Sequence, residues 1–226
     1  MESCAVLYSG GKDSNLALHK ALMSGVKIKF LISLVPSSPE AWMWHWSNAQ
    51  WTVLQAQALE IPILTAKTEV GEISEMKGLE TILSKLKGKI DAIVTGGIAS
   101  RYQADRIESL CRRLGMDMIS PLWGIAPEEE WQELLTLGFE IIITSVSTEG
   151  LEANWLGRIV DEKTFFELME LSKKYKFNLS GEGGEFETFV LFGPDFKKRI
   201  KIIKGYKKWD KRTKSGYFRI TKAILI

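Results

Sequence analysis

Hydrophobic and polar residues follow two patterns along the chain, continuous apolar runs and helical spacing. These patterns predict strands and helices in alternation. The apolar run from Cys4 to Tyr8 predicts a buried strand that ends at a glycine-rich turn, and Asn15 to Met23 has helical spacing. The same reasoning predicts strands at 28–35, 61–65, 91–95, 116–119 and 139–146, and helices at 49–59, 75–86, 99–114 and 128–137. Such alternation is typical of an α/β fold with a doubly wound, mostly parallel, Rossmann-like sheet.

The alternation changes near residue 147. A loop, a helix over 162–175, a second glycine-rich loop and a basic strand pair follow. We therefore expect two parts: an α/β domain over residues 1–146 and a smaller C-terminal α+β region over residues 147–226. The second part, which contains the basic strand pair, is expected to contribute to substrate binding.

Length and composition exclude several classes of protein. With 226 residues, 45% of them hydrophobic, the chain is long enough for one sizeable domain with an appendage and too apolar for disorder. Apolar runs are shorter than the roughly 18 residues of a spanning helix, and the first one leads straight into Ser9–Lys12, so neither a membrane segment nor a signal peptide is expected. Cys4 and Cys111 are too few and too distant for a disulfide framework or a metal knuckle, which favours the cytoplasm.

The net charge of +2 conceals an asymmetry. Residues 197–222 hold 12 Lys or Arg and one acid, Asp210, and therefore carry +11, whereas the other 18 basic and 27 acidic residues sum to −9. A basic segment on an acidic body is able to contact nucleic acid or an acidic protein. Lysines on an edge strand also prevent unwanted pairing, and the alternation of Ile200, Ile202 and Tyr206 with lysine favours this second interpretation.

The most informative motif follows the first predicted strand and precedes the first helix: Ser9-Gly10-Gly11-Lys12-Asp13-Ser14. Glycines allow backbone N–H groups to turn toward an anion, and the helix N-terminus favours negative charge. Lys12 adds a point charge, and the hydroxyls of Ser9 and Ser14 are potential donors, so the motif predicts a phosphate cradle. It is not a Walker A loop, because Val6 and Asp13 stand where that loop needs glycine and Ser or Thr. A carboxylate beside phosphates needs a cation between them, so we infer Mg²⁺ bound by Asp13.

A second glycine-rich turn, Gly96-Gly97, follows the fourth predicted strand. In a doubly wound sheet, ligands bind beyond the carboxyl ends of the strands where the strand order reverses. Two glycine-rich turns at neighbouring strand ends would form an open floor for a nucleotide. A plain tight turn into the next helix explains Gly96-Gly97 equally well.

Three further segments carry charged or aromatic side chains next to glycines. Residues 97–106 open a helix and hold Tyr102 and Arg106, and residues 150–158 hold Trp155 and Arg158. In the third segment, residues 181–188, carboxylates stand close together on a glycine-loosened loop and repel one another unless cations lie among them. These carboxylates belong to Glu182, Glu185 and Glu187.

The hexapeptide resembles the pyrophosphate-binding loop of the N-type ATP pyrophosphatases, with the pattern Ser-Gly-Gly-x-Asp-Ser. This resemblance implies a fold of the adenine nucleotide alpha hydrolase type, ATP cleavage between the α- and β-phosphates, and an AMP-activated intermediate. Together with Gly-x-Ile-x-Ser-x-Tyr-Gln, Trp-Leu-Gly-Arg and Glu-Gly-Gly-Glu-Phe-Glu-Thr, it resembles the diphthine–ammonia ligase family, over residues 9–188. The chain departs from that family at Glu152, where Asp is usual, and in the tryptophan-rich stretch 42–46.

The second resemblance implies that ATP, diphthine on translation elongation factor 2 and ammonium give diphthamide, AMP and pyrophosphate. Ammonium is expected to come from solution, because no glutaminase module is recognised. Lys12, Asp13 and the three glutamates are the expected catalytic residues, and the hexapeptide, Gly96, Gly97 and Arg106 are expected to bind ATP. Substrate binding is expected at Tyr102, Trp155, Arg158 and His45, although a structural role for His45 is equally supported.

Two alternatives remain at this point: a tRNA-modifying ATP pyrophosphatase whose basic segment grips RNA, and a non-catalytic nucleotide-binding regulator. Sulfur transfer is not expected, since no catalytic cysteine motif is present. We expect no membrane and no nucleic acid among the partners, and the oligomeric state is open.

Overall fold

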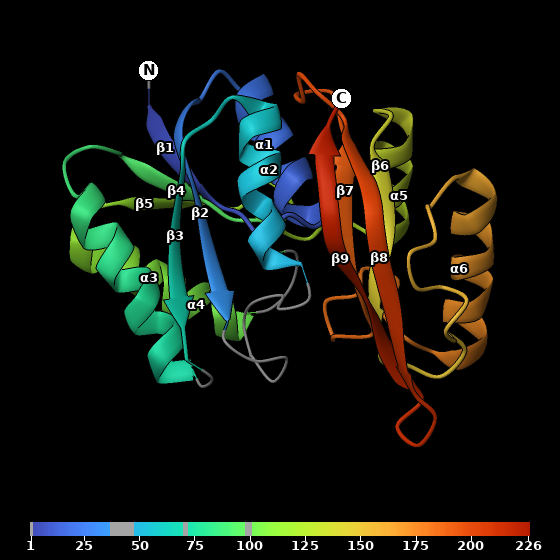
Figure 1. The fold of residues 1–226 in the computed structure, drawn as a ribbon. Coiled ribbons are helices and arrows are strands. Elements are labelled where there is room, and N and C mark those ends of the chain that lie inside the picture. The colour runs from blue at the N-terminus through green and yellow to red at the C-terminus, as the bar shows by residue number, and fades with distance from the viewer. Residues whose placement is uncertain (1, 37–47, 70–71, 98–100) are drawn as a thin grey trace. The chain divides into compact units, whose positions relative to one another are not determined.

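The computed structural model describes residues 2–36, 48–69, 72–97 and 101–226. The chain divides into two compact units, residues 1–124 and 125–226, each with its own sheet (Figure 1). His45, a predicted substrate contact, lies outside the described residues.

The first unit is built on a parallel sheet of five strands in the order β3-β2-β1-β4-β5. The order reverses between β1 and β4, which confirms the predicted doubly wound topology. The strands are β1 (Ser3–Leu7), β2 (Lys27–Pro36), β3 (Ile63–Thr68), β4 (Ala92–Val94) and β5 (Asp117–Ile119). The helices are α1 (Lys12–Met23), the 3-10 helix η1 (Ala49–Trp51), α2 (Thr52–Leu59), α3 (Glu72–Leu86) and α4 (Arg101–Leu114).

Helices cover both faces of this sheet, and the apolar runs of the strands follow from that. Ala5 and Leu7 of β1 belong to a core that also contains Leu83 of α3 and Leu110 of α4. Alternate residues of a strand point to the opposite face, where α1 packs on β1, β2 and β4. A strand buried on both faces has no polar positions to alternate with, so it appears in the sequence as a continuous apolar segment.

The register of β1 and β4 brings two chain turns together. Val6 pairs with Val94, so both strands end at the same edge of the sheet. The phosphate-loop hexapeptide follows β1 there, and the turn Thr95–Gly97 follows β4. The predicted neighbourhood of the two glycine-rich turns is therefore confirmed.

The second unit contains an antiparallel sheet of four strands in the order β7-β6-β9-β8. Long strands β8 and β9 form the predicted basic strand pair, with β8 at the edge of the sheet. The elements are α5 (Pro127–Thr136), β6 (Glu140–Val146), α6 (Glu162–Tyr175), β7 (Phe186–Phe192), β8 (Ile200–Asp210) and β9 (Ser215–Leu225).

The placement of β6 corrects the sequence analysis. Residues 139–146 were expected to continue the parallel sheet, with the division of the chain after them, but β6 pairs antiparallel with β7 and β9. The two units meet between Gly124 and Ile125 instead of near residue 147. An apolar run such as Ile141–Ile143 predicts a buried strand but not the strand with which it pairs, because parallel and antiparallel sheets both bury such strands.

The core of the second unit is centred on Trp131 of α5, whose side chain is fully buried. Its ring stacks on Phe165 of α6 at 6.0 Å between ring centroids and lies 6.4 Å from Phe186 of β7. Its indole N–H donates to the carbonyl oxygen of Leu179 at 2.9 Å. The backbone that leads into the glutamate-bearing loop is thereby attached to the core.

Among the described residues, no helix is both long enough and apolar enough to cross a bilayer.

Candidate functional site

The phosphate loop is organised by its own hydroxyl groups. Gly10 adopts a positive φ of 83°, and its N–H donates to Ser14 Oγ at 3.2 Å. The N–H of Gly11 donates to Ser9 Oγ at 3.3 Å, and Ser14 Oγ donates to the carbonyl oxygen of Gly11 at 3.1 Å. The hydroxyls of both serines were expected to be potential donors to phosphate. In the structure these hydroxyls bind the loop backbone, and so hold the curvature that an anion site needs.

Three side chains that the sequence analysis did not single out support this loop. Gln55 of α2 donates from Nε2 to the carbonyl oxygen of Gly10 at 2.9 Å. Asn15 donates from Nδ2 to the carbonyl oxygen of Gly11 at 2.8 Å, and Tyr8 donates from its hydroxyl to Asn15 Oδ1 at 2.7 Å. The available signal was the presence of polar Asn15 and Gln55 among the apolar residues of two predicted helices.

Lys12 and Asp13 form an ion pair at the first turn of α1. The Lys12 side chain is only 1% exposed, and its Nζ lies 2.5 Å from Asp13 Oδ1. The Asp13 side chain is 29% exposed and so remains accessible from solvent. In the described part of the chain, no group of three or more His, Cys, Asp or Glu side chains is arranged to hold a metal ion. A single carboxylate such as that of Asp13 is the kind of group that binds a cation which draws most of its ligands from water and phosphate, as Mg²⁺ does.

Gly96 is the point of closest approach between the end of β4 and the phosphate loop. A Cβ atom at this position would lie 2.8 Å from the carbonyl carbon of Asp13 and 2.9 Å from the backbone nitrogen of Ser14. Gly97 is less confined, since among the described residues its Cβ would meet only Thr95 Oγ1, at 3.8 Å. Glycine is thus required at position 96 because the backbone packs closely against the start of α1. A tight turn alone would not impose this requirement.

Tyr102 and Arg106 lie one turn apart on α4. The guanidinium carbon of Arg106 sits 3.6 Å from the centroid of the Tyr102 ring, and 44% of Tyr102 is exposed. The helix therefore presents them as one stacked pair, although the sequence analysis gave them separate roles.

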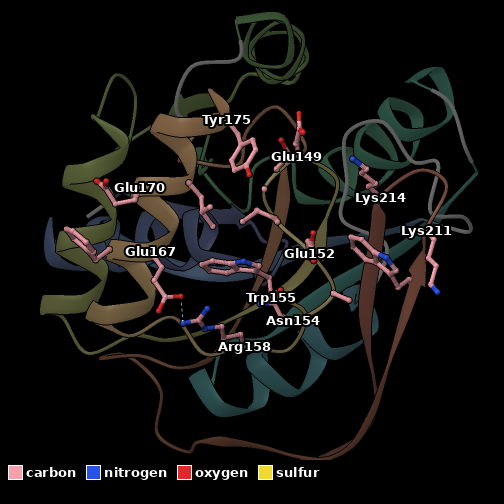
Figure 2. A pocket seen from close by; sticks show the side chains of 17 residues that line it. Glu149, Glu152, Asn154, Trp155, Arg158, Glu167, Glu170, Tyr175, Lys211 and Lys214 are labelled. Atoms are coloured by element: carbon pink, nitrogen blue, oxygen red, sulfur yellow. Dashed lines mark ion pairs between the residues drawn. The ribbon is translucent and has the colours of Figure 1, made fainter.

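A cavity of about 730 Å³ lies in the second unit, lined by the segment 148–158, by α6 and by the tip of the β8–β9 hairpin (Figure 2). Trp155 and Arg158, both predicted to bind substrate, line it together. The Arg158 guanidinium lies 4.7 Å from the Trp155 ring centroid and pairs with Glu167 of α6 at 2.7 Å. The arginine that was expected to be available for a substrate is therefore bound within the protein.

The three predicted glutamates occupy different environments. Glu182 is exposed on the loop, and Glu187 lies in β7 opposite Ser145. Glu185 accepts a hydrogen bond from the Asn178 N–H at its Oε1, at 3.1 Å. Its Oε2 is buried and has no hydrogen-bond partner among the described residues. Because a buried carboxylate oxygen without a donor is costly, Glu185 is the glutamate best suited to receive a ligand proton or a cation.

The two units coincide with two family models. The model of the diphthamide synthase N-terminal domain matches residues 2–118, and that of the C-terminal domain matches residues 126–226. The boundary between the two units therefore falls between the regions matched by the two family models.

Curated relatives agree with these models. A diphthine–ammonia ligase of Bos taurus is 32% identical over 87% of this chain and 81% of its own length, and that of Homo sapiens is 31% identical over the same shares. A solved structure from Methanocaldococcus jannaschii, described as a predicted subunit of a tRNA methyltransferase, has a TM-score of 0.47 and 16% identity, over 86% of this chain and 98% of that one. The structural match is too weak to bear on function, whereas the family models and the relatives establish that the chain belongs to the diphthamide synthase family of diphthine–ammonia ligases.

Proposed function

We propose that this protein is an ATP-dependent ligase that converts the carboxylate of diphthine into the amide of diphthamide, with ammonium as nitrogen donor and AMP and pyrophosphate as products. The observation that carries this proposal is the phosphate loop at the strand-order reversal, built from Ser9–Ser14 and confined by Gly96. The names of the relatives support the substrate class. Translation elongation factor 2 is the protein substrate that we propose, and the cytoplasm is the proposed compartment.

The chemistry explains why a nucleotide is needed. A carboxylate is a poor acceptor for ammonia, because oxide would have to leave. When the carboxylate oxygen attacks the α-phosphorus of ATP, pyrophosphate leaves and an acyl adenylate forms. Ammonia then attacks the acyl carbon, loses a proton, and displaces AMP. The first step replaces a poor leaving group by a good one, AMP, and the second step displaces it.

The loop would act on the departing pyrophosphate. Its backbone N–H groups and the α1 N-terminus favour negative charge, and Lys12 adds a positive charge next to them. Asp13 would hold Mg²⁺, which supplies further neutralisation of phosphate charge when bound. In the structure Asp13 neutralises Lys12 at 2.5 Å, so on binding, Lys12 would exchange this contact for a phosphate of ATP and Asp13 would exchange it for the cation.

The second unit would handle the substrate and ammonia. We assign the uptake of an ammonium proton, or the binding of ammonium itself, to Glu185, whose Oε2 has no hydrogen-bond donor within the described residues. Glu182 and Glu187 are neighbouring carboxylates with the same proposed task. Trp155 and Arg158 are proposed substrate contacts in this unit. On α4 of the first unit, Tyr102 is a proposed substrate contact and Arg106 a proposed phosphate contact. His45 stays a candidate contact for substrate or adenine.

The decisive experiment is mass spectrometry of elongation factor 2 that carries diphthine, after incubation with this protein, ATP and ammonium. Replacing OH by NH₂ lowers the mass by about one dalton. We expect that shift together with equimolar AMP and pyrophosphate, and no shift without ammonium. Release of ADP and phosphate, or an unchanged mass with a competent protein substrate, would overturn the proposal.

A further inference from the structure

Aromatic side chains from separate segments of the second unit meet in the 730 Å³ cavity (Figure 2). Trp155 comes from the segment 148–158, Tyr175 from the end of α6, and Trp209 from β8. Aromatic faces carry negative electrostatic potential and attract cations. Two of the rings show this attraction within the protein itself, because Arg158 lies 4.7 Å from the Trp155 centroid and Lys174 Nζ lies 5.0 Å from that of Tyr175.

The carboxylates of the cavity fall into two groups. Glu167 is paired with Arg158 at 2.7 Å, and Glu170 is paired with Lys173 at 3.1 Å. Glu149 and Glu152, on the segment 148–158, have no ion pair with any of the residues that the structure describes. In the view of Figure 2 they lie on the side of Tyr175 and Trp155, with Lys211 and Lys214 beyond them.

The backbone next to one of these carboxylates approaches an aromatic ring closely. Gly150 has a φ of 92°, and a Cβ there would lie 2.3 Å from Tyr175 Cδ2. The chain can pass this close to the ring only with glycine at 150. Glu149 directly precedes that contact and lines the same cavity as Tyr175.

These features specify the kind of cation that fits. Glu167 and Glu170 are already paired, so Glu149 and Glu152 are the carboxylates of the cavity that are left to face a bound cation. A methylated ammonium has no N–H to satisfy and gains from ring faces and from nearby negative charge. We propose that this cavity binds a methylated ammonium group, with the rings of Tyr175 and Trp209 as its walls and Glu149 and Glu152 as its counter-charges.

This inference rests on the proposed function, because diphthine carries a trimethylated amino group beside the carboxylate that becomes the amide. The cavity would therefore recognise the modification that makes the histidine a substrate. Lys174 lies over the Tyr175 ring and is exposed, so its side chain is able to move away when the substrate cation enters.

The test uses choline and two matched compounds with the full-length protein in the absence of nucleotide. 3,3-Dimethylbutan-1-ol has the shape of choline without its charge, and ethanolamine has the charge without the methyl groups. By calorimetry or saturation-transfer NMR, choline is expected to bind about tenfold more tightly than either one, as a cation–ring contact implies. Equal binding of the neutral compound would overturn the cation site, and equal binding of ethanolamine would overturn its preference for methylation.

Variants connect the binding to these residues. Tyr175→Leu and the double change Glu149→Gln with Glu152→Gln should each weaken choline binding by about tenfold, whereas Tyr175→Phe should preserve it. Lys174→Gln should tighten binding by removing the internal competitor. Circular dichroism verifies folding of each variant, and folded Tyr175→Leu or glutamine variants with unchanged affinity would refute the assignment.

The cavity proposal and the proposed reaction can fail independently. If choline fails to bind while amidation of the protein substrate proceeds, the cavity proposal fails and the proposed reaction stands. If choline binds but no amidation occurs, the proposed reaction fails and the cavity proposal stands.

Discussion

At the scale of single residues, the two cysteines show how burial controls chemistry. Cys4 and Cys111 are fully buried, and burial raises the pKa of each thiol to about 11. Since only the thiolate is nucleophilic, at pH 8 about one thiol in a thousand is reactive even before access is considered. We expect no alkylation of the native protein by iodoacetamide over an hour at pH 8, and alkylation of both thiols in urea.

Mass spectrometry of the intact protein counts the alkylated thiols directly. Rapid alkylation of the native form would mean that one of the two sites opens, and would contradict the burial. Because these thiols are inert, alkylation conditions should also leave AMP release unchanged, as expected for an enzyme that transfers no sulfur.

At the scale of elements, the function of the sheet depends on how closely β4 can approach α1. Replacing Gly96 with alanine would place a methyl group 2.8 Å from the backbone of Asp13, and such overpacking costs about 1–3 kcal/mol. We expect Gly96→Ala to lower the affinity for ATP about tenfold, because the loop must shift to relieve the contact. Titration calorimetry with ATP and Mg²⁺ measures the effect.

Gly97→Ala is the matched variant. Within the part of the chain that the structure describes, its methyl group would meet only Thr95 Oγ1, at 3.8 Å, which is an ordinary contact. A smaller loss of affinity is therefore expected than for Gly96→Ala, with thermal melts to verify folding. Equal losses in the two variants would show that glycine flexibility matters here, and not the close approach.

At the scale of the whole molecule, charge is divided between two parts of one chain. Residues 197–222 carry +11 and the remainder −9, so copies of the protein attract one another at low ionic strength. We expect light scattering to detect association at about 10 mM salt that disappears at about 0.2 M, where the Debye length falls below about 10 Å. Association that grows with salt would point to apolar contacts instead.

The sequence predicted the first unit well for a physical reason. Strands buried on both faces and helices with one apolar stripe leave distinct patterns, and the glycine-rich turns mark the strand ends. The pattern does not show which residues contact one another in the fold. It could not show that β6 pairs with β7 and β9, that Ser9 and Ser14 bind their own loop, or that Gln55 reaches Gly10 from another helix. Such contacts join residues far apart in the chain or depend on side-chain direction, which periodicity does not encode.

The hydrogen bond from Trp131 to Leu179 has a consequence for protein engineering. The loop that bears the glutamates begins just after Leu179, so its shape is anchored by an indole that is fully buried in another element. Grafting residues 178–187 onto a foreign scaffold would transfer the acidic groups without the anchor that orients them. A transplant must therefore include α5 as well, so that Trp131 still donates to Leu179.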